Sequence, residues 1–339
     1  MIFKKYLPLV ILDKLIKLHH FQGEIRIKVE LITNKEIIAV TMATGRQGYG
    51  VITELDKTNK YTIRAIARDP NSPKSLALSK LANVEIIKGD LLNSESLLNC
   101  FENAYGIFGN TTPTKGNIPL VRSYEIDQGR TLINAVKDIN KKGDLKHFVF
   151  SSVCKAKDPL KNEPAPGHFT SKWDIENYLI NNGLREITTI LRPASYFENF
   201  DGDLPGLKIT DRRFPGVVEG NKVWQTIAVK DVGKWTKAAF TNPKRFLGQS
   251  FNLAGEEMTG NEMARLLEKI KGPNTNKISY SMVPRLLMKL FVHDIGVMAD
   301  WIERAQYGAD LNQLRLIAKE ENITITSLES WLNEKIKGT

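Results

Sequence analysis

Short runs of β-branched and apolar residues alternate along the chain with longer segments in which apolar residues recur at helical spacing. From residue 35 onward the pattern predicts strands at residues 35–41, 61–67, 84–88, 104–109, 147–151 and 187–191. Helical spacing predicts helices between them at residues 47–58, 76–81, 120–140 and 172–182. Strands and helices that alternate in this way indicate right-handed crossovers. The fold class is therefore α/β, with a doubly wound, mostly parallel Rossmann sheet that binds ligands at the carboxyl ends of its strands.

The alternation stops after Pro193. Residues 196–225 are rich in Gly, Pro and Asp and are predicted to be irregular. Further on, Thr259 and Glu262 form a capping-box signal for the start of a helix. We therefore predict three parts, namely an N-terminal extension at residues 1–35, an NAD(P)-binding Rossmann domain at residues 36–195, and a smaller mixed α/β C-terminal lobe at residues 196–339 whose contacts interleave with the Rossmann sheet.

The charge of the chain narrows the choice of partners. Lys and Arg outnumber Asp and Glu by 48 to 38, which gives a net charge of +10. A basic surface attracts anions such as phosphorylated cofactors and nucleic acids. The excess is spread thinly over the chain and forms no basic block of the kind that marks a nucleic-acid arm. A solvated, lysine-rich surface is the favoured interpretation, and no direct nucleic-acid binding is expected.

Cysteine and histidine usage point to a reducing compartment and away from metals. Two cysteines, Cys100 and Cys154, cannot form a disulfide framework. The five histidines show no metal-ligand spacing with Cys, Asp or Glu, so no metal is predicted. The apolar run at residues 6–12 is cut short by Asp13 and is far shorter than a membrane span. We expect a cytoplasmic or nuclear location without a membrane, and keep a basic amphipathic anchor as the alternative.

A glycine turn follows the first predicted strand directly and opens the first helix. It comprises residues 42–48, with the sequence Met-Ala-Thr-Gly-Arg-Gln-Gly. In this context glycines let the backbone approach a pyrophosphate, which then rests on the free N–H groups of the helix. The alternative is a tight strand-to-helix turn without a ligand. The position of the turn in the strand–helix alternation favours the ligand.

The end of the second predicted strand indicates which dinucleotide is bound. NAD-binding proteins usually place an acidic side chain there, to bind the ribose 2′-hydroxyl. This chain has Arg68, followed by Asp69 and Pro70. A guanidinium at this position can hold a 2′-phosphate with two hydrogen bonds, which argues for NADP over NAD. The alternative for Arg68 is an ordinary surface arginine at a strand end.

In their order and spacing these segments resemble the NmrA-like family, an atypical branch of the short-chain dehydrogenase/reductases. The resemblance covers residues 36–335 and rests on the segments at residues 43–48, 68–70, 89–90, 168–172, 192–199, 229–233 and 327–331. It implies that the 42–47 turn holds the pyrophosphate of NADP(H), Arg68 its 2′-phosphate and Lys172 its nicotinamide ribose. The full set of implied cofactor contacts is Met42, Ala43, Thr44, Gly45, Arg46, Gln47, Arg68, Asp69, Pro70, Asp90, Leu91, Thr111, Thr112, Pro113, Lys172, Tyr196, Phe197, Glu198 and Asn199.

Two positions of the turn depart from the family pattern. The family usually begins the turn with Gly, and this chain has Met42. A side chain there must point away or crowd the bend of the backbone. The residue after Gly48 is often a second Gly and is Tyr49 here, although Gly50 follows.

The catalytic pair of the active reductases is incomplete. Those enzymes use Tyr-x-x-x-Lys, in which the Lys lowers the pKa of the Tyr that exchanges a proton with the substrate. Here the frame is His168-x-x-x-Lys172. The candidate catalytic residues are Lys172, a hydroxyl from Ser151 or Ser152, and His168 as a substitute acid. The competing interpretations are a structural histidine at a helix start and a surface Lys172 that pairs with Glu176 at i, i+4.

The loss of the tyrosine favours binding over turnover. The resulting hypothesis is an NADP(H)-binding redox sensor that acts through a protein partner such as a transcription regulator. Only a ligand with different affinities for two states can shift a protein between them. The alternative is an NADPH-dependent reductase of a quinone, carbonyl or similar small molecule. A homodimer stays open, and direct DNA binding has no recognition element to support it.

Overall fold

The computed structural model describes residues 16–21, 24–29, 35–116, 118, 121–154, 166–202, 206–291 and 293–337. Its contacts divide the chain into two units, residues 1–35 and 36–339. In the first unit, β1 (Ile16–Phe21) and β2 (Glu24–Val29) pair as an antiparallel hairpin that the sequence did not predict. The apolar run at residues 6–12 lies outside the described residues. No helix in the described part of the chain is long and apolar enough to cross a membrane.

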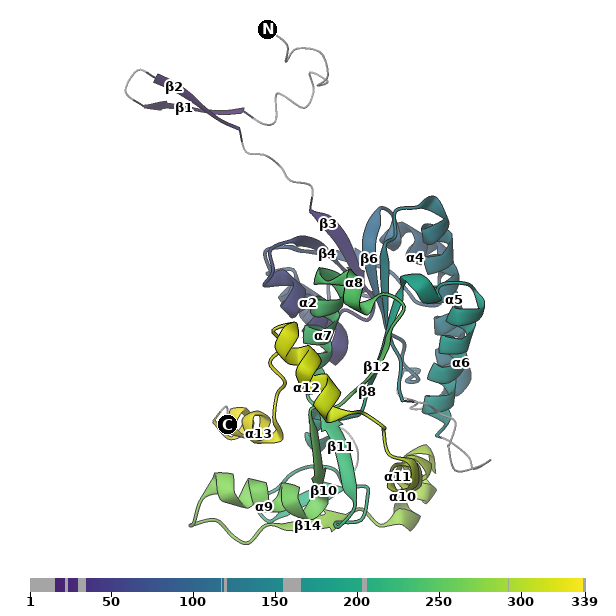
Figure 1. The fold of residues 1–339 in the computed structure, drawn as a ribbon, viewed down its shortest axis with the longest axis vertical. Coiled ribbons are helices and arrows are strands. Elements are labelled where there is room, and N and C mark those ends of the chain that lie inside the picture. The colour runs from purple at the N-terminus through teal and green to yellow at the C-terminus, as the bar shows by residue number, and fades with distance from the viewer. Residues whose placement is uncertain are drawn as a thin grey trace. The chain divides into compact units, whose positions relative to one another are not determined.

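The second unit is built on a seven-stranded sheet in which every neighbouring pair of strands is parallel. Its order is β12-β8-β7-β6-β3-β4-β5 (Figure 1). The bounds are β3 Glu36–Val40, β4 Tyr61–Ala67, β5 Val84–Lys88, β6 Ala104–Gly109, β7 His147–Ser151, β8 Thr188–Pro193 and β12 Ser250–Leu253. The predicted doubly wound, mostly parallel sheet is confirmed. The six predicted strands are present, and β12 is an additional edge strand that the sequence pattern did not reveal.

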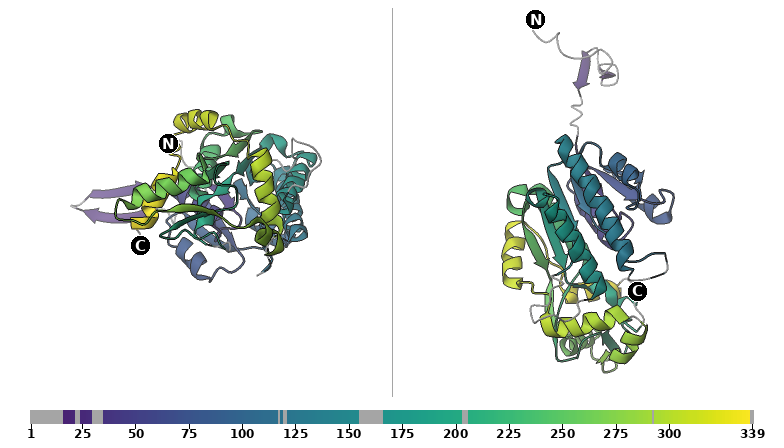
Figure 2. Two further views of the ribbon diagram at one scale, coloured as in Figure 1. Left: turned by 90° about the horizontal axis from the view of Figure 1, so that it is seen from below. Right: turned by 90° about the vertical axis from the view of Figure 1, so that its right-hand side faces the viewer.

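Helices cover both faces of this sheet because its strands are apolar on both faces. Along β3, Ile38 and Val40 belong to one core cluster, and Ala39, which points to the opposite face, belongs to the other. The first cluster is completed by α2 (Arg46–Asp56), α3 (Pro73–Leu78) and α7 (Val229–Thr241), and the second by α4 (Ser94–Phe101), α5 (Arg122–Lys142) and α6 (Gly167–Asn181). Figure 2 shows from two further directions that helices flank the sheet on either side.

Three helices differ clearly from the prediction. α6 begins at Gly167, five residues before the predicted start, so His168 lies in its first turn. α3 begins three residues earlier than predicted, because Ser72 caps it by accepting from the backbone N–H of Ser75 and Pro73 occupies its first turn. α4 was not predicted. It is one short amphipathic helix with Asn93 as its N-cap, and only Leu97, Cys100 and Phe101 are buried.

The rest of the second unit is mixed. A three-stranded sheet has the order β13-β11-β9, and β10 pairs with β14 in parallel. The remaining elements are η1 Arg185–Ile187, β9 Ser195–Tyr196, η2 Phe197–Phe200, β10 Arg213–Gly216, β11 Val223–Ile227, α8 Pro243–Phe246, β13 Glu256–Thr259, α9 Gly260–Lys271, β14 Ser279–Met282, α10 Arg285–Phe291, α11 His293–Ala305, α12 Leu311–Glu320 and α13 Leu328–Lys337. The predicted capping box is confirmed at the start of α9. Residues 196–225 are less irregular than predicted, because they contain η2, β10 and the start of β11.

Tyr49, one of the two departures from the family pattern, lies beside the crossing of α2 and α7. A Cβ atom on Gly233 of α7 would lie 2.3 Å from the carbonyl oxygen of Gly50 on α2, so the two helices touch through backbone. Gly50 is buried there, whereas the side chain of Tyr49 is 50% exposed. The crossing therefore requires glycine at Gly233, whereas a Cβ atom on Gly50 would lie at an ordinary contact distance of 3.5 Å from the Cα atom of Lys230. The side chain of Tyr49 faces solvent and does not enter the crossing.

Candidate functional site

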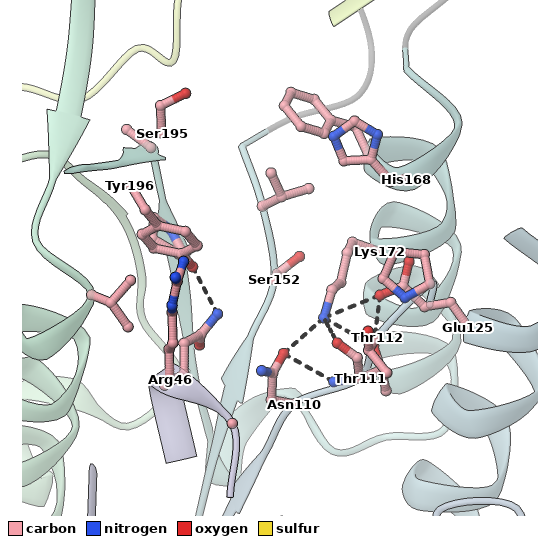
Figure 3. Close-up of a pocket in the computed structure, with 18 of the residues that line it drawn as sticks. Arg46, Asn110, Thr111, Thr112, Glu125, Ser152, His168, Lys172, Ser195 and Tyr196 are labelled. Atoms are coloured by element: carbon pink, nitrogen blue, oxygen red, sulfur yellow. Dashed lines mark hydrogen bonds and ion pairs between the residues drawn. The ribbon is translucent and has the colours of Figure 1, made fainter. Parts of the chain in front are cut away.

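A cavity of about 410 Å³ opens at the carboxyl ends of β3, β6, β7 and β8 (Figure 3). β3 and β6 are neighbours in the sheet, and the chain winds away from them in opposite directions. Such a switch point is where doubly wound folds bind their ligands. The lining residues are Met42, Gly45, Arg46, Gln47, Asn110, Thr111, Thr112, Pro113, Glu125, Ser152, Val153, His168, Phe169, Lys172, Pro193, Ala194, Ser195, Tyr196, Asn199, Val229, Met298 and Tyr307.

The glycine turn lies at one side of the cavity. Met42 adopts a left-handed backbone conformation with φ of 51°, a region that glycine occupies without strain. The turn is so tight that a Cβ atom on Gly48 would lie 2.3 Å from the carbonyl oxygen of Met42. Met42 thus adopts the left-handed backbone conformation that glycine usually has at this position. The cost of the substitution is strain in the backbone of Met42.

The first turn of α2 has no acidic side chain and no side-chain cap on its backbone N–H groups. Gly45 is the N-cap and supplies no side-chain oxygen, and the first turn has no acidic residue. The backbone N–H groups of Gln47 and Gly48 donate to no other residue in the described ranges. Unsatisfied donors at a helix N-terminus form an anion-binding site together with the helix dipole.

Lys172 projects from α6 into a polar group that we call the Lys172 cluster, made of Lys172, Glu125, Asn110 and Thr111 (Figure 3). The Nζ atom of Lys172 donates to Oδ1 of Asn110 at 2.9 Å and to Oγ1 and the carbonyl oxygen of Thr111 at 2.9 and 3.0 Å. It also pairs with Oε1 of Glu125 at 3.3 Å. The predicted alternative, a surface lysine paired with Glu176, is wrong, because Glu176 pairs with Arg192 instead.

Glu125 is the counter-charge of Lys172. Its side chain is fully buried on α5 and accepts hydrogen bonds from the hydroxyls of Thr111 and Ser171. Burial lowers the pKa of Lys172 below its ordinary value, and the nearby Glu125 carboxylate opposes that shift. A buried charge is tolerated only when it is paired and hydrogen-bonded, and both members of this pair are.

The predicted hydroxyl donors after β7 differ in their partners. Oγ of Ser151 donates to Oε1 of Gln47 at 2.7 Å, and Nε2 of Gln47 donates to the Tyr196 hydroxyl at 2.7 Å. This chain of hydrogen bonds ties β7 to the glycine turn and to β9. Burial raises the pKa of Tyr196, so its phenol stays protonated. Ser152 lines the cavity, and its buried hydroxyl has no partner among the described residues. An unpaired buried hydroxyl is an exception among native proteins and calls for an explanation.

His168 lies one helical turn before Lys172, at the start of α6. Its Nδ1 atom and its backbone N–H bond to Oδ2 of Asp294, which comes from α11. The other oxygen of Asp294 accepts from the backbone N–H of Gly167. Burial by itself raises the pKa of Asp294, but the hydrogen bonds and charge of His168 and the two backbone N–H groups together hold it below its ordinary value.

Apolar side chains form another part of the cavity lining. We call it the aromatic wall, made of Phe169, Met298 and Tyr307, with Trp301 packed behind them. Phe169 and Trp301 meet edge to face at 5.1 Å between ring centroids. The hydroxyl of Tyr307 bonds to Oγ of Ser195 at 2.7 Å. The wall combines residues from α6 and from the segment around α11.

Several predicted contact residues lie outside this cavity. Arg68 follows β4 with an exposed side chain that has no partner among the described residues, and the carboxylate of Asp69 accepts from the backbone of Asn71 at 2.9 Å. Asp90 follows β5, and its Oδ1 accepts from the N–H of Leu92 at 2.9 Å. Because β3, β4 and β5 are adjacent, these residues and the glycine turn share one edge of the sheet.

The predicted segment 196–199 is divided between different surroundings. Tyr196 and Asn199 line the cavity, whereas Phe197 is fully buried against Trp331. Glu198 accepts from the N–H of Val229 at 3.0 Å and lines a second hollow, of about 580 Å³, beside α2. Pro70 and Leu91 do not line the cavity, whereas Thr111, Thr112 and Pro113 do.

Sequence reasoning missed four residues of the site. Asn110, Glu125, Asp294 and Tyr307 were not singled out, although each binds or flanks a predicted residue. One signal was available for Glu125, because a buried lysine requires a counter-charge. Asp294 and Tyr307 carry no local motif. In the described part of the chain, no three His, Cys, Asp or Glu residues gather as a metal site.

The sheet order, the glycine turn and the cavity at the switch point define a Rossmann-type α/β protein. A family model described as the NmrA-like family matches residues 34–332, so this chain belongs to the NmrA-like family. The predicted resemblance is confirmed.

Curated relatives carry the description of oxidoreductases. The NmrA-like family domain-containing oxidoreductase FrzB of Cladobotryum sp is 34% identical over 168 residues, which cover 48% of this chain and 48% of that protein. The corresponding oxidoreductase malD of Malbranchea aurantiaca is 33% identical over 175 residues, covering 50% and 49%. The matched stretch thus spans about half the length of these relatives.

Solved structures share the fold. The crystal structure of NmrA, a negative transcriptional regulator, in complex with NADP has a TM-score of 0.67 at 19% identity, and covers 89% of this chain and 95% of that one. The NADPH-dependent quinone oxidoreductase QOR2 of Escherichia coli, complexed with NADPH, has a TM-score of 0.66 at 22% identity, covering 88% and 99%.

Proposed function

We propose that this chain binds NADP(H) along the carboxyl edge of its sheet. The observation that carries the proposal is the convergence of unpaired donors at that edge. The N–H groups of Gln47 and Gly48 suit a pyrophosphate, and the exposed guanidinium of Arg68 suits a 2′-phosphate. The structures of NmrA with NADP and of QOR2 with NADPH have the same fold.

The Lys172 cluster fits the nicotinamide ribose. An ammonium group has three donors, and the Nζ atom of Lys172 lies within 3.3 Å of oxygens from Asn110, Thr111, Ser151 and Glu125. It has more acceptors than protons, so a ribose hydroxyl can replace one of them without leaving the charge unpaired. The unpaired hydroxyl of Ser152 offers a further hydrogen-bonding atom to the ligand.

We infer that the bound cofactor serves the reduction of a small, flat, apolar carbonyl compound, quinones included. The aromatic wall supports this class of substrate, because aromatic side chains favour stacked and edge-on contacts with flat rings. The relatives FrzB and malD bear the name oxidoreductase. When bound, NADPH supplies the hydride. Lys172 orients the cofactor, and the apolar lining excludes water.

A regulatory role is the second candidate. The replacement of the catalytic tyrosine by His168 favours a protein that senses the cofactor and signals to a protein partner, and one structural relative is a negative transcriptional regulator. The protein partner, a homodimer and a nuclear or cytoplasmic location remain predictions.

Calorimetric titration with NADPH, NADP, NADH and NAD tests the binding proposal. Arg68→Ala is expected to weaken NADPH binding about 10-fold to 100-fold, because a charge-assisted bidentate contact is lost. The same variant leaves NADH binding unchanged, since NADH has no 2′-phosphate. Arg130→Ala, which removes an exposed arginine that lies over Tyr178 on α6, is the matched control. Equal loss of NADPH and NADH affinity, or no binding at all, contradicts the proposal.

Steady-state NADPH oxidation separates the two candidates. A reductase oxidises NADPH with members of a panel of quinones and aromatic aldehydes, and loses that activity in Lys172→Ala. Tight NADPH binding with no oxidation by any compound of the panel favours the regulatory role. In that case a difference between NADP and NADPH affinity is the signal to follow.

A further inference from the structure

The most unusual feature of the cavity is a carboxylate placed behind its histidine. Asp294, on α11, holds Nδ1 of His168 and the first backbone N–H groups of α6. The imidazole lines the cavity with 18% of its side chain exposed, and its Nε2 atom has no hydrogen-bonding partner among the described residues. Figure 3 shows the ring at the cavity rim, on the same helix as Lys172.

We propose that His168 is the proton donor of the reaction and that Asp294 is the residue that positions it. The inference rests on the reductase function proposed above and adds the group that takes the place of the missing tyrosine. His168 occupies the position one helical turn before Lys172, so its ring faces the same cavity. The geometry resembles the carboxylate–imidazole pairs of hydrolases only in the role of the carboxylate, which fixes the ring and stabilises the imidazolium.

The hydrogen bond to Asp294 sets the direction of proton transfer. In both protonation states Nδ1 keeps its proton against the carboxylate, so only Nε2 gains or loses one. The protonated ring therefore presents one N–H group to the cavity. The low pKa of Asp294 keeps a charged carboxylate against Nδ1 of the ring.

Other charged groups around His168 are few. The titratable side chains that share the cavity are Lys172, Glu125, Arg46, Tyr196 and Tyr307, and Asp294 contacts the ring from behind. The Lys172 and Glu125 charges offset each other as an ion pair. Burial raises the pKa of both tyrosines, so neither phenol is charged near neutral pH. Asp294 is thus the anion in direct contact with the His168 ring.

The proton balance of the step is complete. With an aldehyde or ketone as substrate, the carbonyl carbon gains the hydride that NADPH would supply in becoming NADP, and the electron pair of the C=O π bond moves to the oxygen. His168 donates its Nε2 proton to that oxygen, so the carbonyl becomes an alcohol. The neutral imidazole regains a proton from solvent through the exposed edge of the ring.

The first test does not depend on turnover. The imidazole signal of His168, assigned by its loss in His168→Gln, is titrated by NMR in the NADP-loaded protein. Asp294→Asn keeps an oxygen that can cap α6 but removes the charge, so the titration midpoint of His168 is expected to be lower in the variant than in the wild type. Asp174→Asn is the control, because it removes an exposed carboxylate of the same helix that pairs with Arg122. An unchanged midpoint in Asp294→Asn overturns the positioning role.

The second test uses kinetics with NADPH and the responsive carbonyl compound. Asp294→Asn is expected to move the high-pH fall of kcat/KM toward lower pH, and His168→Gln to lower kcat at least about 100-fold. NADPH affinity, measured by calorimetry, stays unchanged in both. Equal kcat in His168→Gln and the wild type overturns the donor role while the reductase proposal stands. Tight NADPH binding without turnover on the whole panel overturns the inference and the reductase proposal together, and leaves the binding proposal intact.

Discussion

The two sides of the cavity differ in how completely their polar groups are paired. In the Lys172 cluster every charged or polar side chain has partners inside the protein. Elsewhere in the cavity lining, the buried hydroxyl of Ser152 and the Nε2 atom of His168 have none among the described residues. Native proteins pair nearly all their buried polar groups, and the exceptions call for an explanation.

The Lys172 cluster is therefore the fixed half of the site, in which side chains are already held by hydrogen bonds. The aromatic wall is the other half, in which few hydrogen bonds are made within the protein. A saturated network holds its side chains in one arrangement before anything binds. Such preorganisation suits a cofactor, whose position must be the same in every encounter. The aromatic wall offers shape and stacking with few committed hydrogen bonds, which suits a surface that selects among small molecules.

The largest expected effect comes from breaking the fixed half. Glu125→Ala leaves the Lys172 charge buried without its counter-ion, and is expected to lower the free energy of unfolding by about 3 kcal/mol. The control is Asp174→Ala, which breaks the exposed pair with Arg122 and is expected to cost less than about 1 kcal/mol. Urea unfolding followed by circular dichroism measures both. Equal losses in the two variants would show that the Lys172 cluster is no more than a surface ion pair.

Asp294→Asn is expected to have a smaller effect and to lower the free energy of unfolding by about 1.5 kcal/mol. Asp294 joins α11 to the start of α6, where it accepts hydrogen bonds as a charged group. Its pKa is lower in the folded protein than its ordinary value. The folded state therefore binds fewer protons, and the stabilisation is fully present above the unfolded-state pKa of about 4. It is lost as the pH falls through the lower folded-state pKa.

The contribution of the Asp294 carboxylate to the stability difference between the wild type and Asp294→Asn is thus expected to shrink as the pH falls below about 4. Chemical unfolding across this range measures it. A difference that does not change with pH would mean that the charge of Asp294 contributes nothing, and that only its shape matters.

On the aromatic wall a single hydroxyl can be removed without changing the rings. Tyr307→Phe deletes the hydrogen bond to Ser195 and leaves the contacts with Phe169 and Trp301 in place. The expected loss of stability is about 1 kcal/mol, with NADPH affinity unchanged. Tyr178→Phe, which removes an exposed hydroxyl bonded to Asn134, is the control and is expected to cost less. A drop in NADPH affinity in Tyr307→Phe would extend the cofactor site onto the wall.

The fold could be predicted because its strands are buried on both faces and the helices between them are regular. The six predicted strands depend on local apolar runs, which is why they were found. β12 was missed because its four residues, Ser250–Leu253, are too short and mixed to be distinguished from a loop. It becomes a strand only by pairing with β8, a contact that no local pattern encodes.

The same limit applies to the site. The glycine turn and Lys172 belong to short motifs that can be read along the chain. Asp294 lies 126 residues from His168, and Glu125 lies on a different helix from Lys172. These partners meet only after the sheet has formed and α11 has packed against α6. The competing interpretation of Lys172, a surface pair with Glu176, shows the opposite limit, since a favourable i, i+4 spacing gave way to pairs of Lys172 with Glu125 and of Glu176 with Arg192.

The smallest effect on stability is expected at Met42, which follows β3 in the glycine turn and lines the cavity. A left-handed conformation costs a non-glycine residue about 1–2 kcal/mol, and glycine gives back part of the gain through its greater freedom in the unfolded chain. Met42→Gly is therefore expected to stabilise the protein by about 0.5 kcal/mol. Asn59→Gly, at a similar φ of 52°, is the control and should gain less, because asparagine tolerates this conformation. NADPH affinity should not fall in Met42→Gly, since the turn keeps its shape. A loss of both stability and affinity would mean that the side chain of Met42 supports the cavity wall by more than its backbone strain costs.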